Sequence, residues 1–131
     1  MTIQEMSTAV QYNLPIKIFI LNNQYMGMVR QWQELLHEKN YSESYSAALP
    51  DFVKLAEAYG CHGIRAKNPE ELDEKIKEMI KVNKPVIFDC HVDPNENCFP
   101  MIPSGKPHNQ MLLGPKDQEE NKITGKGKAL V

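Results

Sequence analysis

Two adjacent asparagines, Asn22 and Asn23, are the residues whose type and position best suit chemistry in this sequence. They end a hydrophobic run, and a loop is expected from 22 to 27. An amide oxygen is a neutral, hard ligand for Mg²⁺ or Ca²⁺, and Mg²⁺ often completes its coordination with phosphates and water. Asparagine is also frequent in turns, because it tolerates unusual backbone angles. Position alone leaves both a metal–diphosphate anchor and a plain turn open.

Other reactive side chains have simpler explanations. The neighbours Cys61 and His62, and likewise Cys90 and His91, suggest zinc, but structural zinc sites usually pair ligands two to four residues apart. Adjacent side chains in a strand also point to opposite faces, which disfavours zinc. Asp89 lies among apolar neighbours, so we expect either a position at the sheet edge or a buried, paired carboxylate.

The elements that must position these residues follow from hydrophobic periodicity. Three- and four-residue spacing of apolar side chains predicts helices over 2–12, about 28–38, 50–59 and 69–81. Short apolar runs predict strands over 16–21, 61–66 and 86–92, and the first of these is typical of a strand buried on both faces. This alternation predicts an α/β fold, a parallel sheet flanked by helices. Its ligands would bind at the carboxyl ends of the strands.

Local signals predict where the helices begin and end. Thr2 and Glu5 have the spacing of a capping box, and Asn68 precedes a proline and two acids at the start of a helix. Gly60 is a natural helix stop. The expected buried stripe of the 28–38 helix consists of Val29, Trp32, Leu35 and Leu36.

Composition narrows the class of protein. The 131 residues are 41% hydrophobic and 24% charged with a net charge of −2, so no general attraction to nucleic acid is expected. The sequence contains neither an apolar run of about 20 residues, as a membrane span needs, nor a secretory signal. Three sparse cysteines favour a reducing compartment, which we take to be the cytoplasm.

The chain divides into three expected parts. Residues 1–93 carry the α/β pattern. Residues 94–115 hold five of the nine prolines and are expected to form an extended segment of the same domain. Residues 116–131 are charged and weakly apolar, and are expected to be disordered.

Four stretches carry a resemblance to a known family: "IQEMSTAVQYNLPIKIFILNNQYMGMVRQWQ", "LPDFVKLAEAYG", "GIRAKNPEELDEKI" and "PMIPSG". Over roughly residues 1–113 the sequence resembles the C-terminal, thiamine-diphosphate-binding domain of the acetohydroxyacid synthase (acetolactate synthase) catalytic subunit. The "GMVRQWQ" that follows the asparagines is the most specific part. The resemblance implies the thiamine-diphosphate-binding fold, truncated at the N-terminus.

The resemblance also implies roles for individual residues. Asn23 would give its side-chain oxygen to Mg²⁺, and Tyr25 would give its backbone carbonyl. Asn22 would shape the turn at the cofactor site, and Gly27 and Met28 would approach the reactive end of thiamine diphosphate.

A substrate channel is implied as well, lined by Met28 and Trp32. For Trp32 the spacing supports a place in the helical core equally well, since the residue shares its stripe with Val29 and Leu36. Both roles remain open at this stage.

The activity implied by the resemblance is condensation of pyruvate with a second 2-oxo acid, a step of branched-chain amino-acid synthesis. Thiamine diphosphate and Mg²⁺ would serve here, and FAD would bind a central domain outside this segment. The catalytic glutamate would come from the N-terminal domain of a neighbouring subunit, so no catalytic residue is expected in this chain. Expected partners are the remainder of the catalytic polypeptide, a second copy forming a homodimer, and a small regulatory subunit.

The resemblance is incomplete in one respect. The superfamily motif begins with Gly-Asp-Gly, which is absent from this sequence, and its aspartate would be the charged ligand of the metal. We therefore expect a fragment that is inactive alone. The alternatives are another thiamine-diphosphate decarboxylase or oxidase, and a non-catalytic α/β interaction module.

Overall fold

The computed structural model describes residues 2–115, which fall into two compact units. The sheet unit comprises residues 2–24 and 47–94, and the helical unit comprises residues 25–46 and 95–115. Each is described by itself below. The expectation of a disordered tail at 116–131 lies outside the described residues.

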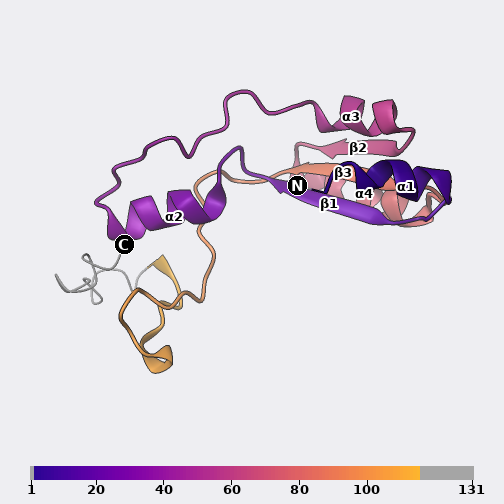
Figure 1. The fold of residues 1–131 in the computed structure, drawn as a ribbon. Coiled ribbons are helices and arrows are strands. Elements are labelled where there is room, and N and C mark those ends of the chain that lie inside the picture. The colour runs from indigo at the N-terminus through magenta and orange to yellow at the C-terminus, as the bar shows by residue number, and fades with distance from the viewer. Residues whose placement is uncertain (1, 116–131) are drawn as a thin grey trace. The chain divides into compact units, whose positions relative to one another are not determined.

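The sheet unit is built on three parallel strands in the order β1-β3-β2 (Figure 1). Strand β1 is Lys17–Asn22, β2 is His62–Ala66 and β3 is Val86–His91. The central strand pairs on both sides, with Ile20 and Arg65 each opposite Asp89. The helices of this unit are α1 (Glu5–Gln11), α3 (Phe52–Tyr59) and α4 (Pro69–Lys81). The predicted α/β parallel sheet is therefore confirmed.

Alternate residues of the strands feed two cores. On one face Phe88 packs beneath α4, in a cluster that comprises Ile64, Ala66, Val86, Phe88 and Cys90, with Leu72, Ile76, Met79 and Val82 against it. On the other face Ile87 meets α1 and α3, in a cluster of Met6, Ala56, Cys61 and Ile87. The period-two alternation of strand side chains explains this division.

The burial of the strands differs from the prediction. β1 is an edge strand of this sheet, and Phe19 and Leu21 are 39% and 68% exposed, so the expectation that it is buried on both faces is wrong. The strand buried on both faces is β3. The edge alternative for Asp89 is wrong for the same reason, because this residue lies in the central strand with 1% exposure.

One helix end follows its signal and two do not. Gly60 ends α3 with a left-handed φ of 81°, as predicted. The capping box is wrong, since α1 begins at Glu5 with Gln4 at its N-cap position and no side-chain cap bond. Asn68 occupies the N-cap position of α4, but its amide donates to Glu71 at 2.9 Å instead of accepting from the helix.

The helical unit contains α2 (Gly27–Leu36) and a C-terminal segment with a short 3₁₀ helix, η1 (His108–Gln110). Met101 and Leu112 form an antiparallel bridge within that segment. Polar residues are central to this unit: Arg30 and Gln31 are the most buried residues of α2, at 7% and 3% exposure. The predicted stripe is thus wrong at Val29, which is 43% exposed.

Candidate cofactor-binding site

Asn22 is the last residue of β1, and its side chain is used twice within the sheet unit. The amide nitrogen donates to Asp89 Oδ1 at 2.8 Å, and the amide oxygen accepts from the backbone N–H of Gln24 at 3.1 Å. The second bond is an Asx turn, in which Gln24 takes a left-handed φ of 61°. Asn22 therefore shapes the turn around Asn23.

A row of polar groups extends from Asn22 across all three strands. Asp89 Oδ2 accepts from Arg65 Nε at 2.8 Å, and the guanidinium also reaches Asp51 Oδ1 at 2.6 Å. Asp51 caps α3 by accepting from the N–H groups of Val53 and Lys54. The hydrogen bond from Arg65 lowers the pKa of Asp51. The pKa of Arg65 is raised, most by its hydrogen bond to Asp51 and next by its hydrogen bond to Asp89.

Asn23 follows the strand directly and is half-buried at its carboxyl end. In parallel α/β sheets this is where ligands bind. The structure thus places the predicted amide at the predicted rim of the sheet.

The remaining predicted residues lie in the helical unit. The ring of Tyr25 packs against Tyr45, with 5.1 Å between centroids, and against the Arg30 guanidinium at 5.4 Å. Gly27 begins α2 and is exposed, as is Met28 beside it. The structure therefore brings Tyr25, Gly27 and Met28 together at the start of one helix, whereas Asn22 and Asn23 belong to the sheet unit.

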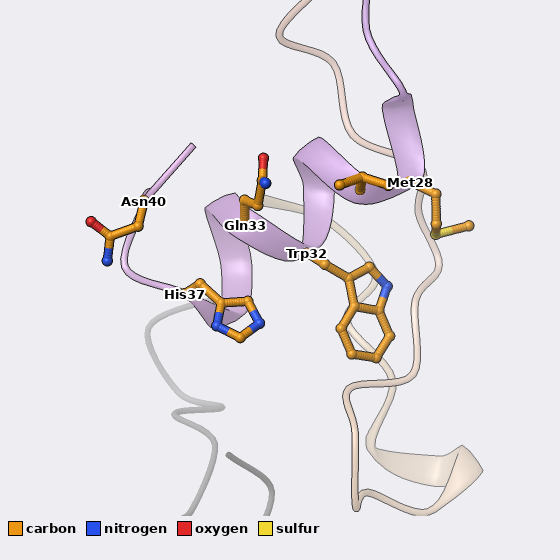
Figure 2. Close-up of a pocket in the computed structure, with 6 residues that line it drawn as sticks. Met28, Trp32, Gln33, His37 and Asn40 are labelled. Atoms are coloured by element: carbon orange, nitrogen blue, oxygen red, sulfur yellow. The ribbon is translucent and has the colours of Figure 1, made fainter. Parts of the chain in front are cut away.

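Met28 and Trp32 line one open hollow on the surface of α2, with a volume of about 620 Å³ (Figure 2). Val29, Gln33, His37 and Asn40 complete its lining. Trp32 is half-buried, so within its own unit it contributes both to packing and to the wall of the hollow.

Arg30 and Gln31 were not among the expected buried residues of the helix, because charged and amide side chains do not contribute to an apolar stripe. Arg30 pairs with Glu34 at 2.8 Å and donates to the Asn95 side chain at 3.1 Å, with its guanidinium over the rings of Tyr25 and Tyr41. The signal available in the sequence was the opposite charge of Arg30 and Glu34, which lie one helical turn apart.

The side chain of Gln31 binds the backbone of the C-terminal segment at Cys98. Its amide nitrogen donates to the carbonyl of Cys98, and its oxygen accepts from the N–H of Cys98, both at 2.8 Å. The polar residues of "GMVRQWQ" that are buried here thus serve structure, while Met28 and Trp32 face the hollow.

Comparison with known proteins decides the family. Residues 1–90 match the thiamine pyrophosphate enzyme, C-terminal TPP binding domain. The chain belongs to this family. The match spans both asparagines and the whole of "GMVRQWQ".

Relatives of this C-terminal TPP-binding domain share much of the sequence. The chain is 45% identical over 122 residues to the acetolactate synthase large subunit of Haemophilus influenzae, covering 92% of this chain and 21% of that protein. It is 49% identical over 113 residues to the large subunit of Cyanidium caldarium, covering 86% and 19%. The chain spans about a fifth of the length of these curated relatives.

A solved structure shares the fold of the family. The thiamine diphosphate-dependent 4-hydroxybenzoylformate decarboxylase of Rhodococcus jostii RHA1 superposes with a TM-score of 0.64 and 27% identity. The match covers 72% of this chain and 18% of that one.

The donors present fit the metal that a TPP-binding domain implies. An asparagine oxygen and a backbone carbonyl are the hard oxygen ligands that Mg²⁺ takes when phosphates and water fill its other positions. Among residues 2–115 no group of three or more His, Cys, Asp or Glu side chains could hold a metal, so a site built mainly of acids is not formed there.

Within the described part of the chain, no helix is both long enough and apolar enough to cross a membrane.

Proposed function

We propose that this chain is the cofactor-binding part of an acetolactate synthase, which condenses pyruvate with a second 2-oxo acid in branched-chain amino-acid synthesis. Thiamine diphosphate, when bound with Mg²⁺, supplies the electron sink for decarboxylation and carbon–carbon bond formation. Because the chain spans about a fifth of its relatives, the proposal assigns it cofactor binding and leaves turnover to the complete enzyme.

The arrangement at the carboxyl end of β1 is the observation that carries this proposal. The side-chain amide of Asn22 donates to Asp89 and accepts from the N–H of Gln24, so Asn22 stabilises the turn. Asn23 is proposed as the metal ligand, because it lies at the position where a parallel sheet binds ligands. The backbone carbonyl of Tyr25 is proposed as the second protein ligand.

The helical unit contains the remaining residues of the proposed site. Gly27 and Met28 would approach the reactive end of the cofactor, and Met28 and Trp32 would line the route of the substrate. The shared hollow on α2 supports this assignment, because it is largely apolar and presents a large aromatic surface. These side chains would exclude water and orient the 2-oxo acid; none is proposed to transfer a proton.

The proposed partners are those that the resemblance to acetolactate synthase large subunits implies. We propose association with the remainder of the catalytic polypeptide, which would carry FAD and the catalytic glutamate, with a second copy in a homodimer, and with a small regulatory subunit. The three cysteines are free, two of them buried, which supports a reducing location such as the cytoplasm.

Two observations favour other candidates. The solved relative named a decarboxylase supports a related thiamine-diphosphate reaction on the same scaffold. The exposed Phe19 and Leu21 on edge strand β1 favour a non-catalytic module that binds a partner through this apolar surface.

Calorimetric titration with thiamine diphosphate and Mg²⁺ tests the proposal. Wild-type chain should bind the cofactor only with the metal, and Asn23→Ala should weaken binding by more than about tenfold, because even outer-shell partners of metal ligands are worth that much. Asn83→Ala, an exposed amide before β3, is the matched control and should bind as wild type. Absence of heat at millimolar cofactor, with no acetolactate formed, would overturn cofactor binding by this chain and favour the interaction module.

A further inference from the structure

The buried carboxylate of Asp89 joins Asn22 to the rest of the sheet. In the register of β1 and β3, Asn22 lies opposite His91, so it is the diagonal neighbour of Asp89 on the same face. Arg65 lies directly opposite Asp89 on the other side. One carboxylate therefore receives a hydrogen bond from each neighbouring strand, from Asn22 at Oδ1 and from Arg65 at Oδ2, both at 2.8 Å. The ring of His91 approaches Oδ2 at 3.4 Å.

The donor and acceptor groups around Asn22 fix the orientation of its side-chain amide. An ionised carboxylate only accepts hydrogen bonds, so the Asn22 amide must turn its NH₂ toward Asp89. Its oxygen then faces the N–H of Gln24 and closes the Asx turn. With the opposite orientation, the NH₂ of Asn22 would face the Gln24 N–H, donor against donor, and the turn would lose its bond.

We propose that Asp89 is a positioning residue of the cofactor site, which acts through Asn22 to fix the turn that presents Asn23 at the carboxyl end of β1. This inference rests on the proposed function, because it assumes that Asn23 binds the metal. Arg65 pairs with Asp89 across the neighbouring strand, so the turn is anchored to β2.

Asp89→Asn separates positioning from mere packing, since the side chains have nearly the same shape. The single oxygen of the new amide would go to the charged Arg65, because hydrogen bonds to charged groups are the stronger ones. Its NH₂ would then face the NH₂ of Asn22. The Asn22 amide would flip to relieve this clash and would release the N–H of Gln24.

The double variant Asn22→Asp with Asp89→Asn should restore the turn. The amide at 89 can accept from Arg65 and donate to the carboxylate at 22, whose second oxygen accepts from Gln24 N–H. Restoration by exchanging the two side chains is not expected if Asp89 only fills space. Asp51→Asn is the control, because it alters the Arg65 pair but retains a capping side chain and leaves Asn22 untouched.

Hydrogen exchange at the Gln24 amide reads the turn without any cofactor. Exchange should rise about fivefold in Asp89→Asn, the effect of one hydrogen bond of ordinary net strength. It should return to the wild-type rate in the double variant and stay there in Asp51→Asn. Calorimetry should show cofactor affinity about tenfold weaker in Asp89→Asn, at least partly restored in the double variant.

The two measurements distinguish failure of this inference from failure of the proposed function. Unchanged Gln24 exchange in Asp89→Asn overturns the inference, whether or not the cofactor binds. Altered exchange with cofactor affinity within twofold of wild type also overturns it, because the turn would then not serve the site. If wild-type chain does not bind thiamine diphosphate, the proposed function fails, and with it the role of the turn at a cofactor site.

Discussion

The two units of this chain are stabilised by different kinds of side chain. The sheet unit buries apolar residues on both faces of β3, with Phe88 fully buried in one of the two clusters. In the helical unit the most buried residues of α2 are Arg30 and Gln31, which bind the segment around 95–98 through charges and amides. The sheet unit buries mainly apolar area, whereas the helical unit buries charged and amide side chains beside apolar ones such as Leu36 and Leu112.

The difference matters for function, because the two kinds of packing respond differently to change. An apolar core tolerates related shapes and loses stability with lost volume. A buried polar network is stable only while every member has a partner. The proposed metal ligand Asn23 lies in the first kind of unit, but its turn depends on a buried polar row of that unit, through Asn22 and Asp89.

Phe88→Ala tests the apolar half of the comparison and should have the largest effect. The ring is 0% exposed and packs on Phe19 with 4.6 Å between centroids, so truncation should cost about 4 kcal/mol of unfolding free energy. Urea unfolding followed by circular dichroism measures it. Phe19→Ala is the matched control: this ring is 39% exposed and its loss should cost less than half as much. Equal losses would show that the buried face does not dominate this unit.

Arg30→Met tests the polar half and should cost about 3 kcal/mol, because it leaves the buried side of Glu34 without its cation. Trp32 is the only tryptophan of the chain, so its fluorescence reports on the helical unit. Arg30→Lys keeps the charge but loses the planar stacking between Tyr25 and Tyr41, and should fall between wild type and Arg30→Met. If Arg30→Met were as stable as wild type, apolar contacts would hold this unit too.

The same contrast explains how far the sequence predicts the fold. The strands and helices of the sheet unit were predictable within a few residues, because their apolar side chains follow the period of each element. The burial of the strands was not: the unbroken hydrophobicity of 16–21 predicted a strand buried on both faces, whereas 86–91 is the central, buried strand although it carries Asp89. The partners of Asp89 come from the other two strands, which no local pattern indicates.

The site was predictable only where a motif exists. Asn22 and Asn23 stand out by position, and the structure supports the turn-shaping role of Asn22. Arg65 and Asp51 could not be found, because they reach Asp89 through strand pairing that no local pattern encodes. Trp32 is half-buried and lines a hollow on α2, and its role in a substrate channel stays a prediction.

Gln31→Leu tests the importance of buried polar contacts in the helical unit at a neutral side chain. Leucine keeps the volume but leaves the N–H and carbonyl of Cys98 without their partner, which should cost about 2 kcal/mol. Gln33→Leu removes a single bond to the carbonyl of Ser42 and should cost about half of that. Trp32 fluorescence in urea measures both variants. A stabilised Gln31→Leu would mean that this unit prefers an apolar core after all.

The smallest effect is expected at the surface of the sheet unit, where Glu78 of α4 pairs with His62 at 2.8 Å. The hydrogen bond from His62, with help from Lys75, lowers the pKa of Glu78 below its usual 4.5. A carboxyl whose pKa is lower in the folded state stabilises that state above the unfolded pKa and ceases to do so as pH falls through the folded value. Because the side chain is 36% exposed, the contribution should be only about 0.3 kcal/mol.

The difference in unfolding free energy between wild type and Glu78→Gln should therefore be present at pH 6 and vanish toward pH 3. Glu74→Gln, an exposed position on the same helix, should show a smaller dependence on pH. A difference above 1 kcal/mol at pH 6 would show that surface charge contributes to this unit on the scale of its core, and the contrast between the two units would then have to be redrawn.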